Sequence, residues 1–346
     1  MPGRTIIIYT THSLTIVLAV GLFIAGNSQA ADSLEKGDRV LWQDPGRGAR
    51  NLFYGQGGER HQPAGTTFDF LEEQSSGSTP KFKVTDSSGT KWKVKLGVET
   101  KPETAATRLV WGAGYSTDED YFLNQIHVRN LPAHLSRGQQ YVKPGGLIRD
   151  ARLERDDPNE KDAGRWKWKD NAFRGTKEWN GLRVLMSLMN NWDLKDVNNA
   201  VYFVKREEPD KGNSAPRYIY VVSDLGATFG PARLDMGRTH NKGELKSYAR
   251  TSFIRKTESA QVSFSAPAPP SLPILFLNPF AYIRRLQLIW IGRDIPRADA
   301  RWMGTILGRL TPAQIRDAFR AGGYSAEEVE GFAVIVEKRI AALRAL

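Results

Sequence analysis

The sequence has no cysteine, and this absence excludes several kinds of chemistry at once. No disulfide, no thiolate zinc site and no cysteine nucleophile is possible in a chain of 346 residues without that side chain. Histidine is scarce too: there are five, and none share a metal-ligand spacing such as HxxxH, so we expect no zinc. No nucleic-acid-binding motif occurs either, which makes nucleic acid an unlikely partner.

The charge balance is strongly basic. Lysine and arginine number 49 against 38 acidic residues, a formal charge of +11, and they are spread along the sequence. This excess favours acidic partners such as phosphates or anionic membrane surfaces. With 40% hydrophobic residues, the chain is long enough to bury one large core or two lobes.

The N-terminal residues predict export. Arg4 precedes an apolar run from Thr15 to Ala25, and Ser28-Gln29-Ala30 has the small-x-small pattern of a signal peptidase site. We therefore predict a signal peptide over residues 1–30 and a periplasmic or secreted protein. The alternative is that residues 6–25 stay uncleaved as a membrane anchor, in which case the membrane is also a partner.

The first half of the remaining chain predicts a small β-rich lobe. Alternating apolar and polar residues, separated by turn-forming residues, indicate strands over 67–73, 81–84 and 91–96 in an antiparallel meander. A helix follows, with Pro102 in its first turn. Two further strands, 121–128 and 147–153, would complete a five-stranded sheet. The polar stretch 154–164 then has no apolar period and predicts a boundary.

The second half predicts a mainly helical lobe. Residues 200–205 and 217–222 indicate a hairpin around a polar insert. Thr311 with Gln314, and Ser325 with Glu328, form capping boxes that open two helices. A further helix, earlier in this half, has an apolar stripe at helical spacing, formed by Trp179, Leu182, Leu185, Met186 and Met189. The predicted class is α+β, divided into residues 31–158 and 159–346.

The hexapeptide DLKDVN, which lies between that helix and the hairpin, carries the residue types that phosphoryl transfer needs. Asp193 would accept the proton of an attacking hydroxyl, Lys195 would neutralise the moving phosphoryl group, and Asn198 would hold a metal ion, with Asn199 as an alternative ligand. Asp224, in Ser223-Asp224-Leu225-Gly226, is a second metal ligand. The hairpin between the two loops predicts that they meet.

The meander offers the residues that would bind phosphate. Lys95 ends the third strand, and we expect it to pair with Glu103 in the next helix. Lys91 and Lys93 are rivals of Lys95, and Glu99 is a rival of Glu103. Backbone groups and hydroxyls of Ser76, Gly77 and Ser78, between the first two strands, would cover the phosphates. Residues 55–58, Gly-Gln-Gly-Gly, are a competing glycine-rich loop.

This order of residues resembles the protein-kinase superfamily, whose catalytic loop reads DLKxxN and whose metal turn reads DFG. Asn191-Trp192 replaces the usual His-Arg, Leu225 replaces Phe, and neither GxGxxG nor APE is present. The sequence is therefore more similar to atypical kinases, such as HipA-like, phosphatidylinositol-kinase-like or secretory-pathway kinases.

The resemblance implies a two-lobed kinase-like fold, ATP with Mg²⁺ or Mn²⁺ as cofactors, and transfer of the γ-phosphoryl group to a hydroxyl of a protein or small molecule. Two other functions stay open. One is an inactive, nucleotide-binding pseudokinase that acts as an interaction module of the cell envelope. The other is a basic protein that binds anionic surfaces.

Overall fold

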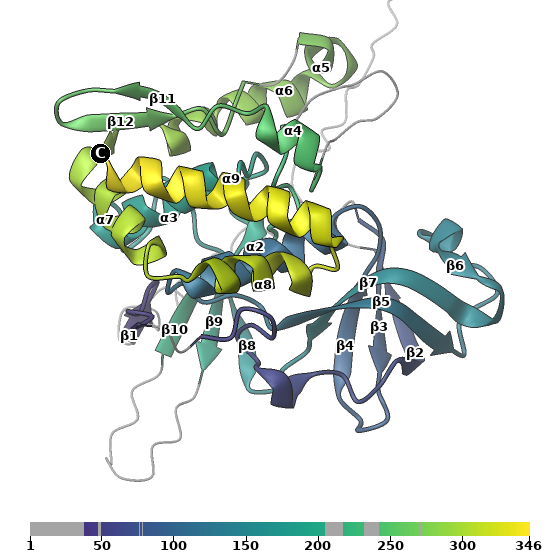
Figure 1. Ribbon diagram of the computed structural model, residues 1–346. Helices are drawn as coiled ribbons and strands as arrows, with labels where there is room; N and C mark the ends of the chain where they lie inside the picture. The colour runs from purple at the N-terminus through teal and green to yellow at the C-terminus, as the bar shows by residue number, and fades with distance from the viewer. Residues whose placement is uncertain are drawn as a thin grey trace, which may run out of the picture.

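The computed structural model describes residues 38–47, 50–75, 77, 79–204, 217–231, 242–269 and 272–346. The expected signal peptide, residues 1–30, lies outside this part of the chain, as does the polar insert of the hairpin. Among the described residues, no helix has both the length and the hydrophobicity needed to span a bilayer. The described chain packs around two separate hydrophobic cores, one in a β-rich lobe and one in a mainly helical lobe (Figure 1).

The β-rich lobe is a sheet that closes on itself. Its strands follow the order β4-β3-β2-β5-β7-β6, and β4 also pairs with β7, so that five strands form a ring. All of these pairs are antiparallel except β2 with β5, which is parallel. The strands are β2 (Thr67–Gln74), β3 (Lys81–Thr85), β4 (Lys91–Lys95), β5 (Asp120–Arg129), β6 (Val142–Lys143) and β7 (Leu147–Arg155).

The meander and both later strands are confirmed, but the sheet has six strands where five were expected, and it closes into a ring. The difference arises because the last residues of β7 pair with β5 on one edge and with β4 on the other, and the first residues of β7 pair with a short sixth strand, β6. Alternation along β4 fills the ring: Trp92 and Val94 are fully buried, whereas Lys93 and Lys95 lie on the other face. The Trp92 indole N–H donates to the Asp86 carboxylate at 2.9 Å, which satisfies its only polar atom.

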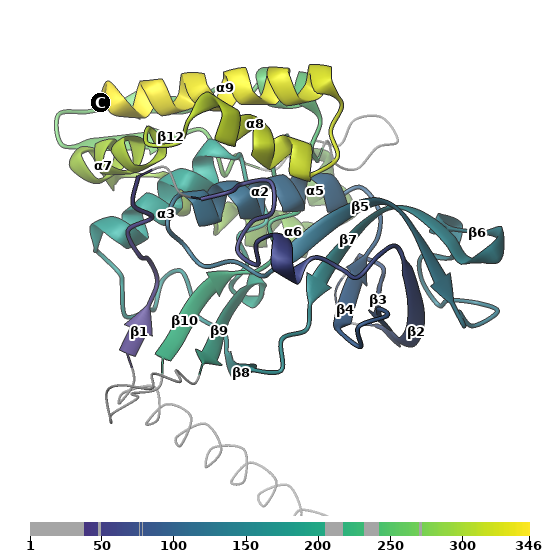
Figure 2. The ribbon, with the colours of Figure 1, turned by 60° about the horizontal axis from the view of Figure 1, so that its bottom comes forward.

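Helix α2 (Thr100–Gly112) connects the two lobes. It opens with Pro102 in the first turn, as predicted, but its apolar side chains Ala105, Ala106, Leu109 and Val110 join the core of the helical lobe. There it packs against α8 (Figure 2). Its other side faces β5 and β7 of the ring. The helix is therefore enclosed by both lobes.

The helical lobe has the three helices that the sequence predicts, α3, α8 and α9, and four more, α4 to α7, that it did not. Thr176 caps α3, and the two capping boxes, Thr311 with Gln314 and Ser325 with Glu328, both form. The helices are α3 (Lys177–Leu188), α4 (Leu245–Ala249), α5 (Leu272–Leu277), α6 (Pro279–Leu286), α7 (Arg297–Leu307), α8 (Pro312–Ala321) and α9 (Ala326–Arg344). Short 3-10 turns lie at Glu59–His61, Gln139–Tyr141, Pro144–Gly146, Asp196–Asn198 and Ile289–Gly292.

Two small sheets belong to the same lobe. One has the order β1-β10-β9-β8, built from β1 (Asp38–Val40), β8 (Glu160–Gly164), β9 (Asn199–Val204) and β10 (Arg217–Val222). The other contains β11 (Ile254–Thr257), β12 (Gln261–Phe264) and β13 (Ile295–Pro296). The predicted hairpin is β9–β10.

Five strands of these sheets have no counterpart in the sequence expectations: β1, β8, β11, β12 and β13. β8 lies in the stretch expected to be an unstructured boundary, because an exposed polar edge strand has no apolar alternation to reveal it. β1 pairs in parallel with β10, which places residues 38–40 with the helical lobe although they fall in the predicted segment 31–158.

Removal of the Trp92 side chain should strongly destabilise the β-rich lobe. We expect Trp92→Ala to lower the free energy of unfolding by about 3–5 kcal/mol, because it leaves a large cavity in the ring and removes one of the hydrogen bonds to the Asp86 carboxylate. Urea unfolding followed by circular dichroism measures this. Val98→Ala, at a position that is 68% exposed, is the control, and an equal loss in both variants would contradict the assignment.

Candidate active site

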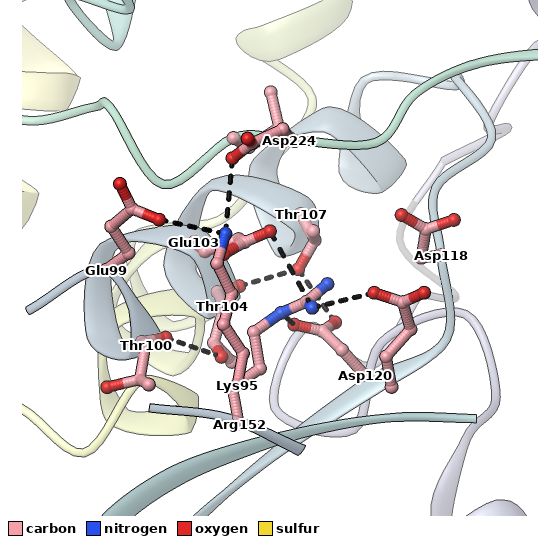
Figure 3. Close-up of polar contacts among 12 residues, drawn as sticks. Lys95, Glu99, Thr100, Glu103, Thr104, Thr107, Asp118, Asp120, Arg152 and Asp224 are labelled. Atoms are coloured by element: carbon pink, nitrogen blue, oxygen red, sulfur yellow. Dashed lines mark hydrogen bonds and ion pairs between the residues drawn. The ribbon is translucent and has the colours of Figure 1, made fainter. Parts of the chain in front are cut away.

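Lys95 is the centre of a charged network between the lobes. Its ammonium nitrogen lies 2.6 Å from Glu103 Oε2, 3.0 Å from Glu99 Oε2 and 3.2 Å from Asp224 Oδ1 (Figure 3). Both helix-side glutamates therefore contact the lysine, and neither is excluded as its partner. Of the rival lysines, Lys93 pairs with Glu154 instead.

Local geometry explains why these groups meet. Glu99 and Glu103 are four residues apart at the start of α2, so they lie on the same face of the first turn, next to the end of β4. Asp224 arrives two residues after β10 ends. Gly226 allows this approach, because a Cβ atom there would lie 2.8 Å from the Glu99 Cβ atom. The glycine of the metal turn is thus required by packing against Glu99.

The network shifts the pKa values of its members in different directions. Burial alone would lower the pKa of Lys95, but Glu103, Asp224 and Glu99 outweigh it and hold the pKa above its usual range. Burial would raise the pKa of Glu99, yet Lys95 and Lys242 keep it well below its usual range. Burial raises the pKa of Glu103 to about 7, against the opposing effect of Arg152 and Lys95.

Arg152, on β7, is a further member of this network that was not predicted from the sequence. The residue lies directly opposite Lys95 in the β4–β7 pairing, so two cations face each other and require carboxylates. Its guanidinium is buried and lies 2.8 Å from Asp120 Oδ2, 3.0 Å from Glu154 Oε2 and 3.6 Å from Glu103 Oε1 (Figure 3). No motif marks it, since an arginine in an alternating strand is normally solvent-exposed.

The hexapeptide forms a loop after α3. The Asn198 side-chain amide donates to the Asp193 carbonyl at 2.7 Å, and the Lys195 ammonium lies 2.9 Å from Asp193 Oδ2. The Ser223 backbone N–H donates to the Asn198 carbonyl at 2.9 Å, so the metal turn is fastened to the loop as the hairpin predicted. Asn199 is buried, and its amide donates to the Trp166 carbonyl at 3.1 Å.

Residues of both lobes line a cleft of about 400 Å³ at this junction. Ser76 and Ser78 lie outside the described residues, but Gly77 between them lines the cleft, and residues 55–58 are not among the lining residues. Asp193 and Lys195 are connected to the cleft through Asn198. The predicted site residues that line the cleft are Gly77, Lys95, Glu103, Asn198, Asn199 and Asp224.

A β-rich lobe and a helical lobe thus enclose a cleft where a strand lysine, a helix glutamate and two polar loops converge. The fold is protein-kinase-like. The α+β class and its β-rich and helical lobes follow the expectation drawn from the sequence.

Comparison with known proteins gives likeness in structure alone. No protein-family model matches the chain, and no curated protein is similar to it in sequence. The chain is similar to the proinflammatory kinase CtkA of Helicobacter pylori, at 11% identity and a TM-score of 0.41, over 81% of this chain and 96% of that one. It is also similar to the Rio2 kinase of Chaetomium thermophilum, at 8% identity and a TM-score of 0.29, over 79% of this chain and 72% of that one. A Golgi casein kinase is similar at 11% identity and a TM-score of 0.30, over 80% of this chain and 74% of that one.

Three carboxylates of the site converge in a way that suits a cation. Oxygen atoms of Glu99, Glu103 and Asp224 lie within 4.8 Å of one another, and the Lys95 ammonium contacts all three. A hard divalent ion such as Mg²⁺ or Mn²⁺ prefers oxygen ligands that also face solvent. Asp224, whose side chain is 42% exposed, and the amide oxygen of Asn198 fit that requirement better than the two buried glutamates.

Lys81 is a second cleft cation that the sequence expectations do not include. It lies on β3 directly opposite Lys95 and lines the cleft. Burial, together with Lys93 and Lys95, lowers the pKa of its ammonium. No hydrogen bond or ion pair joins it to any residue that the structure describes, so an anion in the cleft would be its partner. The repeated Lys-x-Lys of β3 and β4 was the available signal, but it is equally typical of solvent-facing strands.

The raised pKa of Glu103 predicts a stability effect of defined sign. The folded chain binds this proton more tightly than the unfolded chain, so ionisation of Glu103 lowers the free energy of unfolding as the pH rises from about 5 to 8. Glu103→Gln removes this contribution. The wild type should therefore lose about 3 kcal/mol relative to the variant across that range.

Urea unfolding of both proteins at pH 5 and pH 8 checks this expectation. A difference between the two proteins that does not change with pH would mean that Glu103 stays ionised throughout, as its short contact with Lys95 alone would dictate.

Proposed function

We propose that this chain is a kinase that transfers the γ-phosphoryl group of ATP to a hydroxyl group, with Mg²⁺ or Mn²⁺. The observation that carries the proposal is the triple contact of Lys95 with Glu103, Glu99 and Asp224, which joins strand, helix and metal turn at one cleft. Export to the periplasm or outside the cell, predicted from residues 1–30, is part of the proposal.

The cleft residues would bind the nucleotide by charge. Lys95 and Lys81 lie directly opposite each other on neighbouring strands and both line the cleft, so their two ammonium groups could pair with phosphate oxygens there. Gly77, in the left-handed backbone region at φ 77°, leaves the turn above Lys81 free of a side chain. Asp224 and Asn198 would hold the divalent ion, which neutralises phosphate charge when bound.

Asp193 would act on the acceptor. Its carboxylate takes the proton of the attacking hydroxyl as that oxygen forms a bond to the γ-phosphorus and the bond to the β–γ bridging oxygen breaks, leaving ADP. The Lys195 ammonium lies 2.9 Å from Asp193 Oδ2, next to the attacking group, and would neutralise the charge of the moving phosphoryl group. The acceptor is a hydroxyl of a protein or a small molecule.

The two aspartates should differ in how their loss affects phosphate transfer and ATP binding. We expect Asp193→Ala to lower phosphate transfer by at least about 100-fold while ATP binding persists, because Asp193 acts on the acceptor. Asp224→Ala should abolish transfer and also remove the metal dependence of ATP binding. Radiolabelled phosphate transfer and calorimetric titration with ATP, with and without Mg²⁺, measure the two effects.

Asp170→Ala, a change of the same type at an exposed site outside the cleft, is the control. Equal transfer by the wild type and both variants would refute the assignment of the two aspartates. ATP binding by a wild-type chain that transfers no phosphate would instead favour the inactive, nucleotide-binding alternative.

Lys81 and Lys83 provide a matched pair for the phosphate contact. Both lie on the same face of β3, but Lys83 pairs with Glu72 at 3.3 Å and with Asp156 at 3.5 Å and does not line the cleft. We expect Lys81→Ala to weaken ATP binding about tenfold and adenosine binding hardly at all. Lys83→Ala should leave both affinities unchanged. Equal effects of Lys81→Ala on ATP and adenosine would rule out a phosphate contact.

A further inference from the structure

Helices α5 and α6 expose an apolar surface that the fold itself does not use. Phe276 is 83% exposed, Phe280 is 82% exposed and Leu277 is 75% exposed. In α5 only Ile274 is buried, and α6 buries no residue at all. The α5–α6 surface is formed by Leu272, Phe276, Leu277, Phe280, Ile283 and Leu286.

Such a surface is costly in water unless it has a partner. Single exposed apolar residues are common, but contiguous patches of large side chains mark interaction sites. Here the side chains come from two helices that pack against each other at the upper edge of the helical lobe in Figure 1. Their contribution to the core is small, so the packing of the fold does not account for their apolar sequence.

Charge indicates the chemistry of the partner. Between Glu258 and Asp294 the sequence has three arginines and no acidic residue, and two of them, Arg284 and Arg285, are on α6. The whole chain carries a formal charge of +11. An apolar helix face flanked by arginine and without acidic residues is the pattern of helices that lie in the interface of an anionic bilayer.

A second copy of the chain fits this surface less well. In a symmetric dimer the same patch meets itself, which would bring the exposed Arg284 of both copies into a low-dielectric contact without any acidic residue of α5 or α6 to pair with it. A bilayer containing anionic lipids accepts the apolar side chains in its acyl region and Arg284 among its phosphates.

The α5–α6 surface is also adjacent to the candidate active site. The Arg285 guanidinium lies over the Trp192 ring, 4.5 Å from its centroid, and Trp192 directly precedes Asp193. The Lys242 ammonium lies near the same ring, at 5.2 Å. Whatever binds α5 and α6 therefore comes close to the loop that carries Asp193.

We propose that the α5–α6 surface binds the interface of anionic lipid membranes, inserting Phe276, Leu277 and Phe280. This inference does not rest on phosphate transfer, since it concerns a separate surface. Together with the proposed kinase activity, it would bring the loop of Asp193 to acceptors presented at a membrane.

The absence of cysteine makes a local test possible. The full chain with Phe280→Cys can be labelled at that position alone with an environment-sensitive fluorophore, and Val334→Cys, at a 50% exposed apolar residue on α9, is the matched control. Because the label reports only its own surroundings, membrane binding through residues 1–30 does not confuse the result. The probes are vesicles of phosphatidylcholine alone and of phosphatidylcholine mixed with phosphatidylglycerol.

We expect a blue shift and increased emission at position 280 with the phosphatidylglycerol vesicles, a much smaller change with phosphatidylcholine, and no change at position 334. High salt should reduce the signal, because part of the binding is electrostatic. In competition for the vesicles, the unlabelled double variant Phe276→Ser/Phe280→Ser should displace the labelled protein at least about tenfold less effectively than the unlabelled wild type does.

Four results would overturn the proposal. One is no change at position 280 with either vesicle, and another is an equal change at positions 280 and 334. The third is a wild type that is dimeric by light scattering while the double variant is monomeric, which would assign the surface to self-association. An equal response to both vesicle types would refute the requirement for anionic lipid.

Discussion

The buried ammonium group of Lys95 is the interaction on which the rest of the site depends. An ammonium that is almost removed from water is tolerated only when carboxylates surround it, and Glu99, Glu103 and Asp224 supply three. Glu99 and Glu103 come from the start of α2, Asp224 comes from the turn after β10, and Lys95 itself ends β4. One charge therefore determines how close three segments must come.

The same requirement extends into the β-rich lobe. Arg152 faces Lys95 across neighbouring strands, and Asp120, Glu154 and Glu103 compensate it. Asp120 in turn pairs with the buried Arg108 of α2 at 2.6 Å. Alternating positive and negative groups thus continue from the cleft to the back of the helix. Such networks are stable only when every member has a partner, so the loss of one charge affects the others.

The elements that the sequence predicted well are those with a strong local period or cap. β4 alternates, α3 has its apolar stripe, and α8 and α9 carry capping boxes, so each could be located without knowledge of the fold. Lys95, Glu103 and Asp224 were also recognised, because their residue types and order suit phosphate and metal chemistry. Their mutual contact depended only on the β9–β10 hairpin and on the proximity of β4 to α2.

What the sequence did not predict depends on pairing between distant segments. The closure of the ring requires β7 to meet β4, and the place of β1 requires pairing across more than half the chain. Arg152 and Lys81 matter through the strand opposite each of them, which a single strand cannot reveal. The exposed surface of α5 and α6 could not be predicted for a similar reason: whether a short apolar run is buried or exposed depends on the segments that pack around it.

The position of α2 between two cores limits how this cleft could be controlled. Its first turn carries Glu103, while Ala105, Ala106, Leu109 and Val110 are sealed in the helical lobe. An outward rotation of the helix that separated Glu103 from Lys95 would expose these buried apolar side chains to water. The position of Glu103 beside Lys95 is therefore fixed when the chain folds, although the charge of Glu103 still depends on pH. Regulation by an outward movement of α2 is excluded for the same reason.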